Sequence, residues 1–324
     1  MMLKRNGRAA DADVALVADM CVDLIVRGNV RPRFHQVEQL VADYELDVGG
    51  SGNIFACQIA KLGLRAKVIG RLGEDTFGAH LLRLLAQEGV DTSAIKVEPH
   101  LKTGLGVTLV EPDDRAILTF VGSINAATAA DLPAHPGRCC THWHIASYYL
   151  LAQLRQAWPE FLRRAKQQGV TTSLDPNWDP EEKWTGVEDL FGLVDVFLPN
   201  DAELLAITGE KDMLTAARGV AREGTLVVVK RGENGALAVS KNDVVELARS
   251  QIPPIAGIID SVGAGDNFDA GFLSCWMKGR TLADCLTNGH RCAASSLTRL
   301  GGRQGQVIDR QLFQAVGGNR EQSA

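Results

Sequence analysis

The residues with the clearest potential for chemistry lie close together between positions 259 and 271. Gly263, Ala264 and Gly265 precede an apolar segment with helical spacing, and the carboxylate of Asp266 stands at its start. Unpaired N–H groups at the start of a helix bind anions such as phosphate. A carboxylate at this position would repel a phosphate group. Its presence is explained if it accepts the proton of an attacking hydroxyl during phosphoryl transfer. The alternative is a simple turn followed by a helix N-cap.

This stretch resembles the D-T-x-G-A-G-D-x-F-x-x-G signature of the ribokinase-like, or PfkB, family of carbohydrate kinases, with Ser261 in place of the threonine. The resemblance implies that Asp266 is the catalytic base. It also implies that Gly263, Ala264 and Gly265 form an anion hole for the transferred phosphoryl group. ATP as the phosphate donor and Mg²⁺ as its companion ion follow from the same resemblance.

The segment from 47 to 78 is similar to the N-terminal signature of the same family. In the family a glycine pair and a following asparagine contact the sugar, which implies this role for Gly49 and Gly50. The position of the family's asparagine falls on Ile54, one residue after Asn53. In a helix, an offset of one residue rotates the direction of a side chain by about 100°. Asn53 is therefore a candidate ligand that departs from the pattern, and a capped helix start after a glycine turn is its alternative.

Three further residues are candidates for sugar binding by the same resemblance. Asp23 follows the first predicted strand, where the family places an aspartate that accepts hydrogen bonds from sugar hydroxyls; a turn residue is the alternative. Asn125 follows a predicted strand that we expect to cover the sugar. Asn177 lies in a D-P-N stretch resembling that of sugar and sugar-acid kinases, and the nearby Asp179 would repel a substrate carboxylate, which favours a neutral sugar.

Nucleotide contacts are expected in two places. Asn200 and Glu203 are three residues apart on one helix face, where the N-x-x-E motif of the family helps to order Mg²⁺ through water; a capping box is the alternative. Lys230, Gly232 and Gly235 join two predicted strands, and the resemblance implies that this turn borders ATP, although without the family it is a hairpin turn. The chain contains no Walker A sequence, so the glycines of the 263–265 segment must hold the phosphates.

Two possible ion sites complete the candidates. Asp260 matches the region where many family members bind a monovalent cation such as K⁺, with ordinary loop packing as the alternative. Cys140, His142 and His144 alternate along a predicted strand and share one face, as zinc ligands could. A fourth ligand is not evident in the sequence, and histidines inside a strand are more often buried and neutral, so we expect no zinc site.

The elements that must position these residues alternate between short β-rich runs and helix-period segments, the pattern of a parallel sheet flanked by helices. We expect an α/β fold of the ribokinase-like, doubly wound type, with residues 1–324 as one kinase domain. Segments at about 22–46 and 99–122 break the alternation and should form a small β-sheet lid. Strands are expected at 14–20, 66–71, 140–146, 170–174, 195–199, 225–230 and 236–247, the last a hairpin, and helices at 151–168, 200–223, 264–278 and 281–299.

Composition excludes several classes of protein. The 324 residues are 45% hydrophobic and 23% charged, as in a globular protein, and the net charge of −5 gives no basic surface for nucleic acid or an anionic membrane. Seven cysteines without a C-x-x-C pair indicate reduced thiols, and no apolar run approaches a membrane span, so we expect a cytoplasmic protein. An exposed lid sheet would invite pairing with a second copy, so a homodimer is expected.

Together these features predict an ATP-dependent carbohydrate kinase that phosphorylates a hydroxyl, most simply a primary one, of a neutral sugar. A nucleoside kinase of the same family is one alternative, with Trp143, Tyr148 or Trp178 stacking on the base. A sugar- or nucleotide-binding regulator without turnover is another, although such a module needs no base at position 266. A Rossmann dehydrogenase is excluded because no G-x-G-x-x-G follows the first strand.

Overall fold

The main sheet runs through the middle of the molecule in a computed structural model that describes residues 10–111, 115–252 and 257–309. Its strands are parallel from the β5 edge to β11, whereas β12 and β13 are antiparallel. Across the sheet the order is β13 (Val244–Ala248), β12 (Gly235–Val239), β11 (Leu226–Lys230), β10 (Val196–Phe197), β9 (Thr171–Leu174), β8 (Cys140–Ile145), β1 (Ala12–Val17), β4 (Ala66–Gly73) and β5 (Asp91–Glu98). The expected doubly wound, mostly parallel sheet is confirmed.

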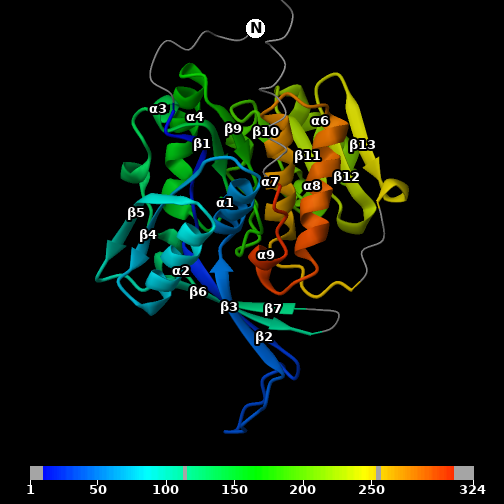
Figure 1. Cartoon of the computed structure of the whole chain (residues 1–324). Coiled ribbons are helices and arrows are strands. Elements are labelled where there is room, and N and C mark those ends of the chain that lie inside the picture. Colours follow the sequence, from blue (N-terminus) through cyan, green and yellow to red (C-terminus); the bar gives the residue numbers. More distant parts are fainter. Residues whose placement is uncertain (1–9, 112–114, 253–256, 310–324) are drawn as a thin grey trace, which may run out of the picture.

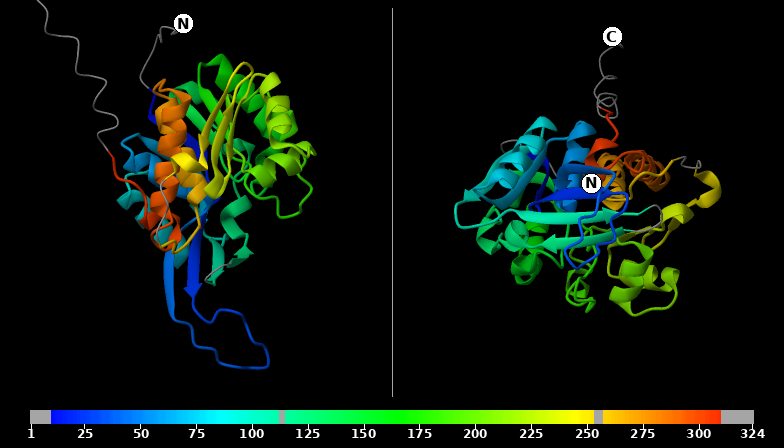
Figure 2. Two further views of the ribbon diagram at one scale, coloured as in Figure 1. Left: turned by 90° about the vertical axis from the view of Figure 1, so that its right-hand side faces the viewer. Right: turned by 90° about the horizontal axis from the view of Figure 1, so that it is seen from below.

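Helices cover both faces of this sheet, as Figures 1 and 2 show. One face carries α1 (Ser51–Lys61), α2 (Thr76–Gln87), α7 (Ala264–Trp276) and α8 (Leu282–Ser296), which share one apolar core with the strands. The other carries α4 (Trp158–Gln167), α5 (Asp201–Thr208) and α6 (Met213–Arg222), which share a second core. Two short helices, α3 (Pro136–Cys139) and α9 (Gly301–Gln304), connect the longer elements. In the described ranges no helix has the length and apolarity needed to cross a bilayer.

A second, four-stranded sheet stands at one end of the main sheet (Figure 1). Its order is β3 (Asp43–Gly49), β2 (Cys21–Arg27), β6 (Gly104–Val110) and β7 (Arg115–Phe120). The two segments that break the alternation in sequence therefore do form one sheet, with β2 parallel to β6. The predicted hairpin of β6 and β7 is confirmed, although most of its turn, at 112–114, lies outside the described residues. The segment between β2 and β3 projects away from the body (Figure 2).

Several element boundaries differ from the sequence-based expectation. The helix expected at 200–223 is two helices, because Gly209 adopts a left-handed conformation (φ 69°) that ends α5, and Asp212 caps the start of α6. The edge strand β5 was not predicted, because its sequence is too polar to give a strand pattern. The first strand ends at Val17, so residues 18–20 belong to the loop that follows it.

The fold brings the candidate residues to one edge. Asn177, Asn200 and Lys230 lie at or beyond the ends of strands of the main sheet, Asp23 lies near the start of β2, and α7 begins beside them. In open parallel sheets, ligands bind outside the carboxyl ends of the strands. The site is therefore expected between this edge and the second sheet.

Candidate active site

The start of α7 is shaped by close backbone packing. Gly263 adopts φ 69°, and a Cβ there would lie 2.8 Å from the Cα of Gly302 and 2.9 Å from a methyl carbon of Ile54. Only glycine satisfies both constraints. The first α-helical hydrogen bond of α7 runs from Asn267 N to Gly263 O at 2.9 Å, so the amides of 264–266 precede it and have no partner within the helix. This arrangement can receive an anion, as the sequence predicts.

Asp266 lies in the first turn of α7 and is 7% exposed. Burial, followed by the charge of Asp175, raises the pKa of Asp266 to about 7. Lys230 and a hydrogen bond with the Ser51 side chain oppose that rise. A carboxylate with a pKa near neutrality, beside a helix start, is suited to accept a proton.

The sugar-side candidates Asp23, Gly49 and Gly50 come together as the sequence predicts. In the register of the second sheet, Asp23 of β2 lies opposite Asp47 of β3 on one side and opposite Gly106 of β6 on the other. A Cβ on Gly49 or Gly106 would collide with the Asp23 carboxylate. Gly50 has φ 82° and packs against the backbone of the loop after β1. Burial and the charges of neighbouring aspartates raise the pKa of Asp23 to about 7. The glycines thus leave the Asp23 carboxylate room at the base of the second sheet.

Asp19, which sequence reasoning did not single out, holds the start of α1. Its carboxylate accepts hydrogen bonds from Ser51 N at 3.1 Å, Gly52 N at 2.9 Å and the Ser147 hydroxyl at 2.7 Å. Helix α1 has no capping side chain of its own, so a carboxylate 32 residues earlier takes that place. The sequence feature that could have indicated Asp19 is the presence of a second aspartate four residues before Asp23.

The three asparagine candidates are all engaged with the protein backbone. Asn53 is fully buried, and its amide donates to Gly49 O at 2.9 Å. The amide oxygen of Asn125 accepts from Gln153 N at 3.1 Å, and that of Asn177, whose φ is 54°, accepts from Ser147 N at 2.6 Å. Asn53 therefore supports the Gly49–Gly50 turn, which favours the structural alternative over direct sugar contact.

A cavity of about 760 Å³ connects the turn after β11 with the start of α7. Lys230, Gly232, Gly235 and Gly265 line it, as expected for the predicted nucleotide contacts. The rest of the wall mixes apolar and small side chains with polar and charged ones. The apolar and small ones are Ile252, Ile258, Ala264, Phe268, Ala293, Ala294 and Leu297, and the polar and charged ones are Arg231, Glu233, Arg249, Ser250, Ser261 and His290. This volume lies within the usual range of ligand pockets.

Asn200 and Glu203 form the capping box that was the alternative to a role in binding. The Asn200 side chain accepts from Glu203 N, and the Glu203 carboxylate accepts from Asn200 N, both at 2.8 Å. A backbone bridge pairs Asn200 with Lys230, which places the start of α5 beside the end of β11. Burial, followed by the charge of Asp175, raises the pKa of Glu203 to about 7. The capping box therefore holds a buried carboxyl group near the cavity that Lys230 lines and that is the predicted place of the nucleotide.

Two buried aspartates surround Lys230. Its Nζ lies 2.7 Å from Asp175 Oδ2 and 3.1 Å from Asp269 Oδ2. Asp175 follows β9, and Asp269 lies three residues after Asp266 on α7. Neither was predicted as a site residue, because nothing local in the sequence indicates that these three elements meet.

The second sheet touches the catalytic segment through Arg115. This residue opens β7, and its guanidinium donates to the Ser261 hydroxyl at 3.0 Å. Ser261 lies two residues before Gly263. The sheet therefore reaches the loop that precedes α7, where the anion hole is predicted.

The family of the chain follows from these features together with a match to known sequences. The model of the pfkB family of carbohydrate kinases matches residues 11–308. The chain belongs to this family. It is a sugar kinase, a phosphotransferase with the ribokinase-like fold.

This kinase matches its relatives over most of their length. The chain is 28% identical over 304 residues to a 2-dehydro-3-deoxygluconokinase of Bacillus subtilis (strain 168), and the match covers 88% of this chain and 93% of that one. It is 26% identical over 284 residues to a fructokinase of Vibrio alginolyticus, covering 83% and 91%. An E. coli structure described as a ribokinase II with ATP and Mg²⁺ aligns with a TM-score of 0.79 at 26% identity, covering 91% and 96%.

Asp260 occupies a satisfied position in this kinase. One carboxylate oxygen accepts from Val262 N at 3.0 Å and the other from Gly301 N at 2.9 Å. These bonds join the catalytic loop to α9. They agree with the loop-packing alternative and leave the cation role a prediction.

The candidate zinc residues are core side chains. His142 Nε2 and His144 Nδ1 lie 2.7 and 2.8 Å from the Ser173 hydroxyl. Burial lowers the pKa of both histidines to about 3, so they are neutral. Within the described part of the chain, no three His, Cys, Asp or Glu side chains converge as metal ligands.

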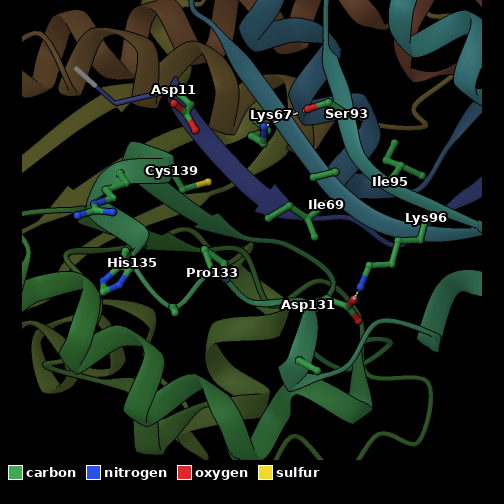
Figure 3. Close-up of a pocket in the computed structure, with 14 residues that line it drawn as sticks. Asp11, Lys67, Ile69, Ser93, Ile95, Lys96, Asp131, Pro133, His135 and Cys139 are labelled. Atoms are coloured by element: carbon green, nitrogen blue, oxygen red, sulfur yellow. Dashed lines mark hydrogen bonds and ion pairs between the residues drawn. The ribbon is translucent and has the colours of Figure 1, made fainter. Parts of the chain in front are cut away.

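A second cavity, of about 470 Å³, is drawn in Figure 3. It lies between β4, β5 and the 130–139 segment, and it extends to Asp11, which precedes β1. Two of its cations are already engaged, Lys67 with Asp91 and Lys96 with Asp131. None of the predicted site residues lines it, so it is separate from the catalytic edge.

The raised pKa of Asp266 predicts the acid limb of activity. A base must be ionised, so protonation of Asp266 below about pH 7 should reduce kcat/KM on the acid side and leave it on a plateau above. Initial rates between pH 5 and 9, with coupling enzymes in excess, measure this. A profile that stays flat down to pH 5 would contradict the assignment of this pKa to the base.

Proposed function

We propose that this sugar kinase transfers the γ-phosphate of ATP to a hydroxyl, most simply a primary one, of a neutral sugar. The observation that carries the proposal is the position of Asp266. It lies at the start of α7, whose neighbouring residues 264 and 265 line the nucleotide cavity. The charge of Asp266 also contributes to raising the pKa of Asp23, so Asp266 is near that residue. Asp266 therefore lies between the residues proposed to bind the sugar and the cavity proposed to bind ATP.

In the proposed mechanism, Asp266 accepts the proton of the attacking sugar hydroxyl while the hydroxyl oxygen bonds to the γ-phosphorus. The bond from the γ-phosphorus to the oxygen that bridges it to the β-phosphate breaks, and ADP leaves with that oxygen. The amides of 263–265 stabilise the charge that develops on the phosphoryl oxygens. Asp23, Gly49 and Gly50 orient the sugar, with Asn125 and Asn177 supporting the surrounding loops. The second sheet closes this side and excludes water, which would otherwise hydrolyse ATP. The chain then acts as a single kinase domain with a lid.

ATP would lie in the cavity lined by Lys230, Gly232 and Gly235, with Mg²⁺ on its phosphates. Three metal-binding side chains do not converge in the described part of the chain, so the ion would be held mainly by phosphate and water oxygens. Asn200 and Glu203 are the residues that would order those waters. Mg²⁺, when bound, neutralises charge on the phosphates. A K⁺ ion near Asp260 remains a proposal on the resemblance alone.

The charge of the site supports a neutral substrate. Asp19, Asp47, Asp260 and Asp266 all contribute to raising the pKa of Asp23, which indicates a negative field where the sugar is expected. The carboxylate of Asp179, on which the sequence argument rests, is held in place by the backbone N–H groups of residues 181, 183 and 184. A substrate carboxylate would thus be repelled mainly by the aspartates around Asp23.

A nucleoside remains the second candidate substrate. Of the aromatic residues considered for stacking, Trp143 and Tyr148 are buried, whereas Trp178 is 52% exposed and directly follows Asn177. Trp178 is therefore the residue that could stack on a base. A regulator without turnover is disfavoured because Asp266 and its anion hole are both present.

Replacement of the base tests the mechanism. Asp266→Asn should reduce kcat by about 10²- to 10⁴-fold, because the amide cannot accept the proton. ADP release with ATP, Mg²⁺ and a sugar panel measures it. Asp284→Asn, an exposed carboxylate in the first turn of α8, is the matched control and should keep the wild-type rate. Equal rates for Asp266→Asn and wild type would overturn the proposed base.

Substrate charge is tested by competition among fructose, 2-dehydro-3-deoxygluconate and adenosine. The negative field around Asp23 predicts a higher kcat/KM for fructose than for the acid. A preference for the acid would overturn the neutral-sugar assignment. A preference for adenosine would favour the nucleoside kinase, and binding without ADP release from any of them would favour a regulator.

The lid also supports a homodimer, which we include in the proposal. The register places Leu24, Val107 and Leu118 in one row, on the opposite face of the sheet from Asp23 and Gly106. Leu118 is 61% exposed, and Tyr44, on the same face, is 68% exposed. A second copy would cover this apolar face.

The seven unpaired cysteines agree with a cytoplasmic protein.

Adjacent residues on β7 provide the test of this interface. Leu118→Asp should convert the dimer to a monomer, because it places a charge on the apolar face. Ile117→Asp, 51% exposed on the opposite face, should leave the dimer intact. Size-exclusion chromatography with light scattering distinguishes them. A wild-type protein that is monomeric at micromolar concentration would contradict the proposed interface.

A further inference from the structure

The cluster of Lys230, Asp175 and Asp269 is unusual because two carboxylates share one ammonium group in the interior. The Lys230 side chain is 11% exposed, that of Asp175 is 2% exposed, and that of Asp269 is completely buried. Asp175 is also held by Asn177, whose backbone N donates to it at 3.2 Å. Two buried carboxylates around one cation leave an uncompensated negative charge, which is costly in a low-dielectric interior.

A proton resolves this imbalance, and the contacts indicate which group holds it. Asp175 has the shorter contact with Nζ, 2.7 Å against 3.1 Å, and it also accepts from Asn177. Asp269 Oδ1 receives no N–H or O–H donor among the described residues, and the Asp269 side chain is within hydrogen-bond reach of Asp175, so this oxygen is placed to carry a proton toward Asp175. Burial raises the pKa of Asp269 well above its ordinary value, whereas the pKa of Asp175 is lowered by Lys230 against the effect of burial.

The location of the cluster connects it with phosphoryl transfer. A Cβ built on Gly265 would lie 3.5 Å from Lys230 Nζ, so the ammonium stands beside the backbone of the anion hole. Lys230 and Gly265 both line the nucleotide cavity. An ammonium group has three N–H donors, and two carboxylate contacts leave one for a phosphate oxygen.

We propose that Asp175 and Asp269 are positioning residues that hold the Lys230 ammonium beside the anion hole, Asp175 as a carboxylate and Asp269 as a neutral carboxylic acid. This inference deepens the proposed function and rests on the assignment of Lys230 to the phosphate side of ATP. The acid group of Asp269 donates its proton to Asp175, and its carbonyl oxygen accepts from Lys230. The ammonium is thereby oriented without a second full negative charge near the transferred phosphoryl group.

The charged surroundings of the cluster determine how it affects the base. Glu203 on α5 and His144 on β8 also face it, and His144 is neutral. Besides burial, the charges of Asp175 and Asp19 raise the pKa of Asp266, whereas Lys230 and a hydrogen bond with Ser51 lower it. Removing the negative charge of Asp175 should therefore lower the pKa of the base, whereas replacing a neutral acid at 269 should leave it unchanged.

A pair of matched substitutions tests the unequal roles. Asp269→Asn copies a neutral acid, because its amide donates to Asp175 and its oxygen accepts from Lys230. It should keep kcat within about threefold of wild type and keep the acid limb of the pH profile. Asp175→Asn removes the closer anionic partner of Lys230 and leaves Asp269, which can then ionise, to draw the ammonium toward its own side. The kcat should therefore fall about 100-fold as the ammonium moves, with the sugar KM nearly unchanged and the acid limb shifted to lower pH.

A difference infrared spectrum of the full chain tests the protonation state even if Asp175→Asn does not fold. Wild type minus Asp269→Asn at pH 8 should show the C=O stretch of a carboxylic acid. Absence of that band, or equal losses of activity in the two variants, would overturn the inference. Absence of kinase activity in the wild type would instead overturn the proposed function, so the two failures are distinguishable.

Discussion

The site depends on burying several carboxylates at the carboxyl edge of one sheet. Asp19, Asp175, Asp266 and Asp269 are each at most 7% exposed. An ionised carboxylate in the interior costs several kcal/mol unless hydrogen bonds or a cation compensate it. Each of the four has its own compensation. Asp19 receives two backbone amides and a hydroxyl, Asp175 receives Lys230, Asp269 shares that lysine, and Asp266 faces Ser51 and the first turn of a helix. Because these partners come from β11, α1, α7 and the loop that follows β8, the site exists only when the whole edge is assembled.

Close backbone packing makes this assembly possible. Gly263 and Gly302 bring α7 and α9 against Ile54 of α1, where a Cβ on either glycine would be too near that side chain. Asn267 strengthens the junction, since its amide donates both to Gly263 O and to Gly302 O at 2.8 Å. Asp260 joins the same two segments through backbone amides. The first turn of α7 is thus held from three sides, which preorganises the amides that would stabilise a developing negative charge.

The sequence predicts the parts of the site that are local and misses those that are assembled. Gly263–Asp266 and Gly49–Gly50 are identified by contiguous residues whose chemistry is evident without neighbours. Asp19 and Asp269 act through partners 32 and 39 residues away, and no local spacing encodes such contacts. The fold shows the same division, since the alternation of strands and helices is a local pattern. The polar edge strand β5 and the break at Gly209 were missed, although Gly209 followed by Asp212 carries the signal of one helix end and the next start.

The second sheet is anchored to the body of the protein at its base. Arg303 of α9 pairs with Asp47 of β3 at 2.5 Å and with Glu88, which follows α2, at 2.6 Å. Asp47 is fully buried and lies opposite Asp23 in the register. The base of the sheet, where Asp23 and Gly49 lie, is therefore tied to two helices of the body. At the other end of the sheet, Arg115 at the start of β7 donates to the Ser261 hydroxyl at 3.0 Å. The residues expected to orient the sugar are thereby held in place relative to the part of the protein that carries Asp266.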